Sequence, residues 1–259
     1  MSTIIYPSPI FGPVHSRRLG LSLGINLMPA DGKVCTFDCI YCECGFNASH
    51  RPKLPRPTRE EVATRLHETL TAMAERGERP DVLTFAGNGE PTAHPDFAGI
   101  IADTIRLRDR LAPSAKVSVL SNATMLHRKE VREALLLVDN NIQKLDTVDI
   151  DYIRLIDRPV SPAYNVEDVI AHLKAFDGHV IIQSMFMKGV IDNGDCDNTG
   201  DRYVLPWLEA VKAIRPREVM IYTIDRETPD PRLRKATPEE LNLIRDRVVR
   251  EGIPCTASY

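Results

Sequence analysis

Short apolar runs alternate along the chain with segments in which apolar residues recur every three or four positions. The first pattern is typical of buried parallel strands, and the second is typical of amphipathic helices that cover them. The alternation therefore predicts an α/β fold with crossover helices. The predicted strands are 20–27, 82–86, 116–120, 142–148, 180–187 and 218–224, with 253–257 as a candidate edge strand.

Helix signals lie between these runs. Thr58 and Glu61 form a capping box, and the apolar stripe behind them continues to Gly77. Thr237 begins a C-terminal helix in the same way. Further helices are predicted at 97–111, 129–138, 166–176 and 203–214.

Composition and charge narrow the class of protein. With 259 residues, 43% hydrophobic and 27% charged, we expect one domain over 1–259. No apolar run approaches the roughly 20 residues that span a bilayer, and no basic leader is present, so we expect a cytoplasmic protein. A net charge of −3 creates no general attraction for nucleic acid. A local basic group leaves RNA open as a partner, and its members are Arg17, Arg18, Arg51, Lys53 and Arg56.

The strongest chemical signal is a cysteine triplet. Cys35, Cys39 and Cys42 form a C-x3-C-x2-C pattern on a predicted loop after the first strand. A cysteine-bound four-iron cluster normally takes four ligands, so three thiolates leave one iron open. An open position is typical of a reactive metal centre rather than a structural one. Zinc is the alternative, with Cys44 or His50 as the fourth ligand. The other cysteines, which are Cys44, Cys196 and Cys255, show no second cluster spacing.

The triplet, with the aromatic Tyr41 directly before its third cysteine, resembles the cluster loop of the radical S-adenosylmethionine (SAM) enzymes. The resemblance implies a [4Fe-4S] cluster on the three cysteines, with SAM chelating the fourth iron. It also implies reductive cleavage of SAM to a 5'-deoxyadenosyl radical, which abstracts hydrogen from a substrate. The implied fold is an open, partial (β/α)6 TIM-like barrel, and the implied electron donor is a flavodoxin or a ferredoxin. From periodicity alone, a doubly wound sheet stays an alternative.

The resemblance also assigns positions at the ends of the later strands to SAM. Glu90 either faces SAM or orders its own glycine-rich turn, and the Tyr41 ring either stacks on adenine or packs. Asp146 either binds SAM or pairs with Lys144 or Arg154. The full set of positions is Tyr41, Gly87, Asn88, Gly89, Glu90, Ser121, Asn122, Asp146, Gln183, Tyr222 and Thr223.

Segments 12–20 and 31–33 extend the resemblance to a subgroup related to the wybutosine-synthesis iron–sulfur oxidoreductases. Arg17 and Arg18 lie in the first of them and are candidates for holding an anionic substrate. The resemblance identifies neither the substrate nor a catalytic residue. Two other functions stay open: a structural zinc or iron–sulfur RNA-binding module without radical chemistry, and an activase for a glycyl-radical enzyme.

Overall fold

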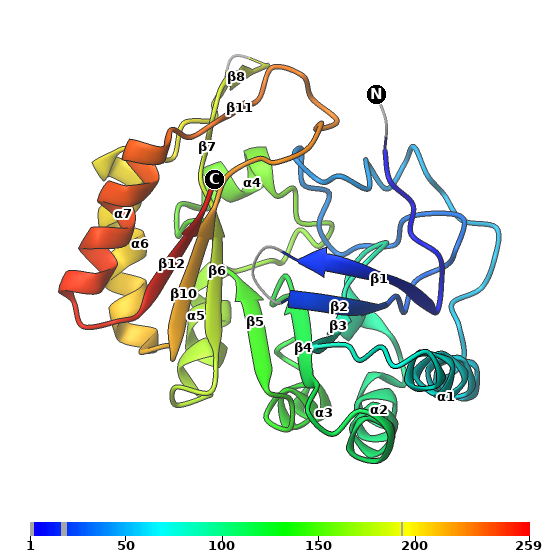
Figure 1. Ribbon diagram of the computed structural model, residues 1–259. Coiled ribbons are helices and arrows are strands. Elements are labelled where there is room, and N and C mark those ends of the chain that lie inside the picture. The colour runs from blue at the N-terminus through cyan, green and yellow to red at the C-terminus, as the bar shows by residue number, and fades with distance from the viewer. Residues whose placement is uncertain (1–2, 17–19, 193) are drawn as a thin grey trace.

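The computed structural model describes residues 3–16, 20–192 and 194–259. In this part of the chain, eight strands form one open sheet in the order β1-β2-β3-β4-β5-β6-β10-β12 (Figure 1). Only the pairing of β1 with β2 is antiparallel. The strands are β1 Ile10–Ser16, β2 Gly20–Ile25, β3 Val82–Phe85, β4 Lys116–Ser121, β5 Asn140–Lys144, β6 Ile181–Met185, β10 Glu218–Tyr222 and β12 Cys255–Ser258. The expected open α/β barrel is confirmed.

Helices cover the outer, convex side of the sheet, while α4 lies at the carboxyl ends of the strands (Figure 1). The helices are α1 Arg59–Glu75, α2 Phe97–Leu111, α3 Lys129–Leu135, α4 Ile150–Ile156, α5 Val166–Lys174, α6 Asp201–Ile214 and α7 Pro238–Arg250, with a 3-10 turn η1 at Pro91–Ala93. Both capping boxes form, at Thr58 and at Thr237. Two small antiparallel pairs of strands lie outside the main sheet: β7 Met187–Lys188 with β11 Arg234–Lys235, and β8 Val190–Ile191 with β9 Gly194–Asp195.

Two elements differ from the sequence prediction. The strand predicted at 142–148 ends at Lys144, because the chain leaves the sheet there and Asp149 caps the unpredicted helix α4 through its side chain. The antiparallel β1 was also not predicted. Its register shifts between Phe11 and Val14, and its internal Pro13 hides the strand pattern.

The two faces of the sheet carry different side chains. Leu83 and Ile182 belong to the large buried core between the sheet and the outer helices. The neighbouring positions Thr84 and Gln183 point to the concave face, because side chains alternate along a strand, and Lys144 is the register partner of Gln183. Polar groups thus line the concave face towards the carboxyl ends of the strands.

A second, smaller core lies at that carboxyl end. It gathers Met185 from β6, Ile156 from α4, Ile224 from the chain after β10, and Ile40 from the cysteine loop. Ile40 is fully buried there, so one residue of the cysteine loop is anchored by apolar packing.

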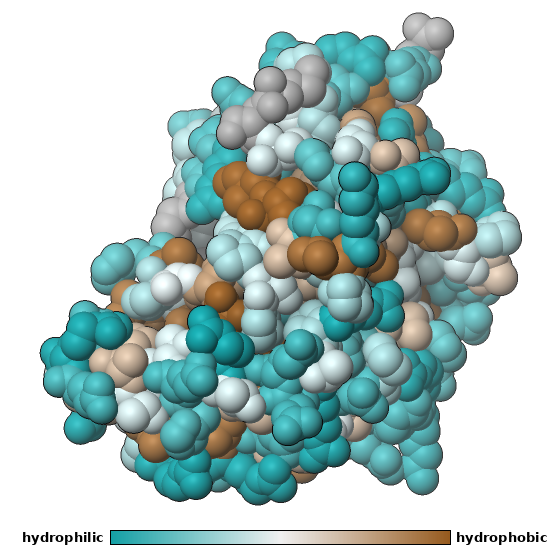
Figure 2. Space-filling view, turned by 90° about the vertical axis from the view of Figure 1, so that its right-hand side faces the viewer, coloured by the Kyte–Doolittle hydropathy of each residue, from teal (hydrophilic) through white to brown (hydrophobic). Residues whose placement is uncertain are grey.

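The surface over the N-terminal half is mainly hydrophilic, with separate small apolar patches (Figure 2). Among the described residues, no helix is both long and apolar enough to cross a membrane. Arg17 and Arg18, the candidate anion-holding pair, lie outside the described residues.

Candidate active site

The cysteine loop is attached on one flank to the turn that follows β3. The Val34 N–H donates to the Asn88 carbonyl at 2.9 Å, and the Glu90 N–H donates to the Val34 carbonyl at 3.3 Å. Val34 and Gly89 thereby form an isolated parallel bridge. The two loops that the sequence assigned to cluster and SAM are therefore neighbours joined by backbone hydrogen bonds.

On its other flank the cysteine loop is attached to the C-terminal end of α4. The Ile40 N–H donates to the Ile156 carbonyl at 2.9 Å, and the Asp38 N–H donates to the Asp157 carbonyl at the same distance. Because both flanks are held by the backbone, the loop has a defined path across the carboxyl end of the barrel.

Asn47 and Lys33 brace the loop from inside. The Asn47 amide donates to the Cys35 carbonyl and accepts from the Cys35 N–H, both at 3.2 Å. The Lys33 ammonium donates to the Gly45 carbonyl at 2.6 Å, and its side chain is only 1% exposed. Sequence reasoning did not name Asn47 and included Lys33 only within segment 31–33, without a role, because a lone Asn or Lys on a loop carries no pattern.

The three thiols differ in pKa although they lie on one short loop. Burial raises the pKa of Cys35 to about 12 and also holds the pKa of Cys39 well above its usual value. Cys42 differs, because a hydrogen bond from the Cys44 thiol lowers its pKa to about 6. Burial lowers the pKa of Lys33, but the fields of all three sulfurs outweigh this effect and raise it.

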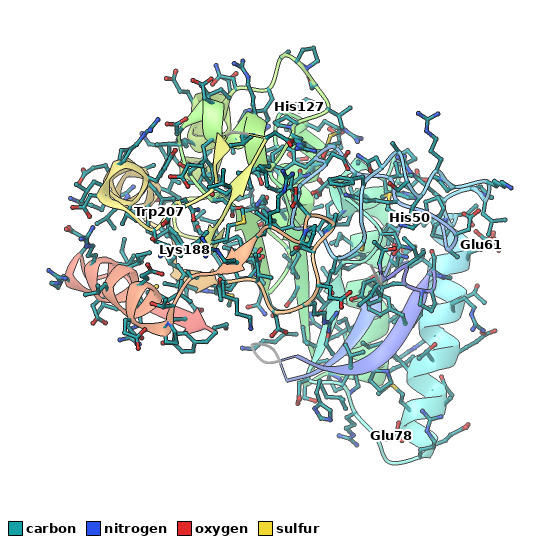
Figure 3. The ribbon with its side chains drawn as sticks, turned by 90° about the horizontal axis from the view of Figure 1, so that it is seen from above. His50, Glu61, Glu78, His127, Lys188 and Trp207 are labelled. Atoms are coloured by element: carbon teal, nitrogen blue, oxygen red, sulfur yellow. The ribbon has the colours of Figure 1, made fainter. Side chains whose placement is uncertain are left out.

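These thiols fit the donor set of an iron–sulfur cluster, since thiolates are its protein ligands. One loop supplies all three, and a buried cation lies within the field of each. Of the two residues considered as fourth zinc ligands, His50 has another partner, because its ring contacts the Thr3 hydroxyl at 2.9 Å (Figure 3). Cys44 lies against Cys42, with its Sγ 3.4 Å from the Gly87 carbonyl oxygen. Among the described residues, no three His, Cys, Asp or Glu side chains are grouped as ligands of a single metal ion.

The two glycines of the turn after β3 allow other parts of the protein, the cysteine loop and Asn26, to approach the turn closely. A Cβ on Gly89 would lie 1.8 Å from the Val34 carbonyl oxygen, and a Cβ on Gly87 would lie 2.8 Å from Cγ of Asn26. Both residues have positive φ, 123° at Gly87 and 145° at Gly89. The Gly-x-Gly pattern thus permits the close approach of the cysteine loop.

Asn88, between these glycines, is fully buried, and its side-chain amide is hydrogen-bonded. Its amide donates to the carbonyls of Tyr6 and Pro29 at 2.8 and 2.9 Å, and its oxygen accepts from the Tyr6 N–H at 2.7 Å. The Asn88 side chain therefore holds the N-terminal segment. The groups that residues 87–89 can offer to a ligand are backbone groups.

Glu90 is likewise engaged. Its carboxylate is 2% exposed and accepts hydrogen bonds from the Thr92 N–H, the Thr92 hydroxyl and the Asn122 N–H, the last at 2.6 Å. Burial raises its pKa. These bonds favour the ordering role that the sequence left open, because they tie the turn after β3 to the end of β4. Nearby, the Ser121 hydroxyl accepts from the Ala123 N–H at 3.0 Å.

An ion cluster lies beside Cys39 on the concave face. The Lys144 ammonium contacts Asp146, the Tyr41 hydroxyl and Asp157, the last at 3.0 Å. The Tyr41 hydroxyl donates to Asp146 at 2.5 Å. Asp146 thus pairs with Lys144 and not with Arg154, the other partner considered. Burial lowers the pKa of Lys144, but the two carboxylates outweigh it and raise the pKa well above its usual value, while burial raises that of Asp157 to about 6.

Of the remaining positions assigned to SAM, two lie on the concave face of the sheet and one is buried elsewhere. Gln183 is on the concave face as the register partner of Lys144, and Tyr222 follows on the same face of the neighbouring β10. Thr223 is 1% exposed, and its hydroxyl accepts from the Ala236 N–H at 2.8 Å. Gln183 and Tyr222 therefore face the site, whereas Thr223 holds the chain before α7.

The N-terminal segment is a part of the site that sequence reasoning did not find. The Ile4 N–H donates to the Glu43 carbonyl at 2.9 Å, and Tyr6 is held by Asn88. Arg226, beyond β10, pairs with the Glu43 carboxylate and donates to the Tyr6 hydroxyl at 3.0 Å. No sequence pattern could have signalled this arrangement, because its members come from four distant parts of the chain.

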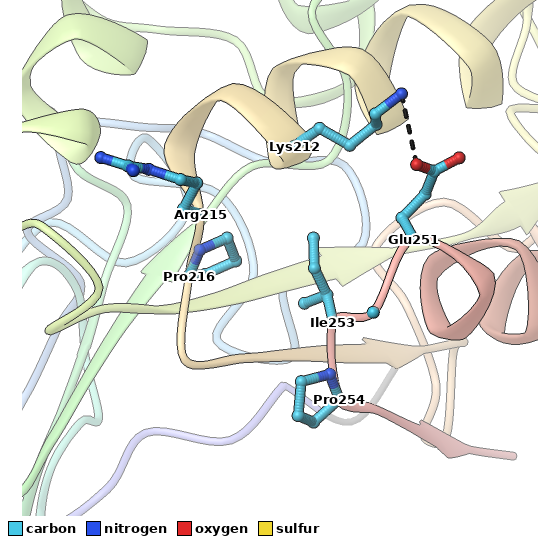
Figure 4. Close-up of a pocket in the computed structure, with 7 residues that line it drawn as sticks. Lys212, Arg215, Pro216, Glu251, Ile253 and Pro254 are labelled. Carbon is cyan, nitrogen blue, oxygen red and sulfur yellow. Dashed lines mark ion pairs between the residues drawn. The ribbon is translucent and has the colours of Figure 1, made fainter.

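A shallow cavity of about 420 Å³ lies at the opposite, amino end of β10 and β12 (Figure 4). Lys212 and Glu251 form an ion pair of 3.3 Å at its edge. It shares no residue with the cysteine loop and is not part of the candidate site. The residues that line it are Lys212, Arg215, Pro216, Glu251, Gly252, Ile253 and Pro254.

Comparison with known proteins identifies the class. Residues 31–194 match the family model described as the radical SAM superfamily, so the chain belongs to that superfamily and is by family an enzyme. The match begins before the first cysteine of the triplet and extends past β8. The expected superfamily is confirmed.

Among curated relatives, the chain is 29% identical over 237 residues to a protein of Brachyspira hyodysenteriae named GTPase Obg, covering 90% of this chain and 32% of that protein. It is 29% identical over 222 residues to a UPF0026 protein of Helicobacter pylori, covering 85% and 67%. The chain thus spans about a third of the first relative and two thirds of the second. Its sequence contains no G-x-x-x-x-G-K-[ST] phosphate-binding loop, the motif typical of GTPases.

Solved structures of other radical SAM proteins have a similar fold. A radical SAM methyltransferase from Sphaerobacter thermophilus has a TM-score of 0.67 at 15% identity, covering 92% of this chain and 66% of that one. TYW1 with a lysine–pyruvate adduct bound has 0.64 at 14%, covering 88% and 73%. Streptococcus suis SuiB bound to SAM also has 0.64 at 14%, covering 91% and 50%. At such low identity the likeness concerns the fold.

Proposed function

We propose that this protein binds a [4Fe-4S] cluster through Cys35, Cys39 and Cys42 and reductively cleaves SAM to start radical chemistry on a substrate. When bound, the cluster and SAM supply the 5'-deoxyadenosyl radical that abstracts a hydrogen atom from the substrate. The observation that carries the proposal is the placement of three thiols on one loop that is fixed, on both flanks, at the carboxyl end of an open parallel barrel. Barrel enzymes place their active sites at that end.

Some residues of the chain would bind the cluster and SAM, and others would shape the site around them. The three cysteines hold the metal, and Lys33 offsets part of the negative charge that they gather. The backbone of the Gly87–Glu90 turn and the concave-face side chains of Gln183 and Tyr222 are proposed to contact SAM. The other assigned positions shape the site through the contacts described above; they are Tyr41, Asn88, Glu90, Ser121, Asn122, Asp146 and Thr223.

Reductive cleavage needs a low-potential electron, and we propose a flavodoxin or a ferredoxin as the donor. The acceptor of the radical is a separate question. The candidates kept from the sequence are an RNA base and, for an activase, a glycine of another protein. Both acceptors require the same cleavage of SAM, and they differ in whether an RNA base or a protein glycine loses the hydrogen atom.

The test uses anaerobically purified, reconstituted protein with dithionite and SAM, and it measures 5'-deoxyadenosine and methionine by mass spectrometry. We expect both products, about four irons and four sulfides per chain, and loss of iron and products in Cys39→Ala. Cys255→Ala is the matched control, because that thiol lies on β12, far along the chain from the loop, and we expect it to retain both. One zinc without sulfide, or an intact cluster that never cleaves SAM, would refute the proposal.

A further inference from the structure

Asn122, directly after β4, has a buried side chain that reaches the cysteine loop. Its amide nitrogen donates to the Thr36 hydroxyl at 2.8 Å and to Sγ of Cys35 at 3.6 Å. Its amide oxygen accepts from the Thr124 N–H at 3.1 Å and from the Thr124 hydroxyl at 2.7 Å. The residue is only 8% exposed.

These contacts use the whole hydrogen-bonding capacity of the side chain. A primary amide has two N–H donors and two acceptor lone pairs, and all four have partners at Thr36, Cys35 and Thr124. The Asn122 backbone N–H is also bound, to Glu90. The amide therefore has no free donor or acceptor for SAM, the contact that the resemblance had assigned to this position.

The orientation of the amide is fixed by the same contacts. Thr124 presents two donors to one end of the Asn122 side chain, so that end must be the oxygen, and the nitrogen must face Cys35. Because the site is buried, this N–H···S contact is shielded from water and is stronger than it would be on the surface.

We infer that Asn122 is a positioning residue for the cluster, whose amide N–H stabilises the thiolate of Cys35 and raises the reduction potential of the cluster. This inference rests on the proposed function. Hydrogen bonds to the sulfurs are among the factors that set iron–sulfur potentials. One added electron makes the cluster sulfurs more negative, so an N–H donor favours the reduced state more than the oxidised one.

The experiment is a redox titration of the reconstituted cluster without SAM, followed by electron paramagnetic resonance. In Asn122→Ala we expect the ratio of reduced to oxidised cluster at a given potential to fall about tenfold, which equals a fall of about 59 mV in the potential of a one-electron couple. Asn122→Asp keeps the shape and the acceptors for Thr124 but replaces the N–H donors with a negative charge, and we expect at least the same fall. Thr124→Val is the control. It removes the hydroxyl that contacts the Asn122 oxygen and the Thr36 hydroxyl, but it leaves the Thr124 N–H on that oxygen and the Asn122 N–H on Cys35.

The outcomes separate the inference from the proposed function. If the wild-type protein takes up no four-iron cluster or cleaves no SAM, both are overturned. If the wild type does both and the two Asn122 variants keep its potential, or if neither variant takes up iron, only the role of Asn122 is overturned. Weaker SAM binding at an unchanged SAM-free potential would assign Asn122 to the cofactor instead.

Discussion

Gly89→Ala provides a direct test of how the cysteine loop is held. The new methyl group would lie 1.8 Å from the Val34 carbonyl oxygen, a backbone atom that no side-chain rotation can move away. Restoring an ordinary van der Waals contact requires a shift of roughly 1.5 Å. The shift separates the cysteine loop from the turn after β3 at the point where they are joined.

The size of the effect follows from what the shift breaks. The hydrogen bonds from Val34 to Asn88 and from Glu90 to Val34 are lost, at about 0.5–1.5 kcal/mol each. Alanine at a φ of +145° adds about 1–3 kcal/mol of backbone strain. We therefore expect a loss of about 2–6 kcal/mol in the free energy of unfolding, together with poor iron uptake.

The assay is urea unfolding followed by circular dichroism, with an iron count after reconstitution. Gly77→Ala is the matched control, because Gly77 also has a positive φ of 73° but a Cβ there would have no atom within 4 Å. The control should lose only the cost of the left-handed conformation, about 1–2 kcal/mol, and take up iron normally. If Gly89→Ala matched Gly77→Ala in both measurements, the reasoning about the close approach would be refuted.

Two further predictions concern buried charges. Lys144→Met leaves Asp146 and Asp157 without their cation, and we expect the free energy of unfolding, measured with urea at pH 8, to fall by about 3–5 kcal/mol. Because the pKa of Asp157 is about 6, the fall should be smaller at pH 5. Adding Asp146→Asn to this variant should recover part of the lost stability. The buried His94 ring contacts the Pro57 carbonyl at 2.9 Å, and burial lowers its pKa below 6.5. The unfolded chain therefore binds this proton first, so stability that is complete above pH 6.5 should be lost as the pH falls through the folded-state pKa. His94→Gln should flatten that part of the profile, and an unchanged slope would contradict the assignment.

Local patterns in the sequence were enough to predict the order of the elements and to find the cysteine triplet. Helix α2 occupies the predicted 97–111, because a local apolar stripe sets its length. The six predicted parallel strands and the edge strand are all present, since buried strands need continuous apolar runs. The cysteine triplet could also be found from the sequence, because three thiols on one short loop lie close together in any fold.

The partners of the polar residues near the strand ends could be read only from the fold. The sequence offered Asn122 as a SAM contact, and Asp146 either as a SAM contact or as a partner of Lys144 or Arg154. In the fold, Asn122 reaches Cys35 across 87 residues and Asp146 meets Tyr41 across 105. A polar side chain that is buried must bond to whichever group the fold places beside it. That neighbour is set by packing between distant segments, which no local pattern records, and so the role of each polar residue became visible only once the barrel had brought its partners together.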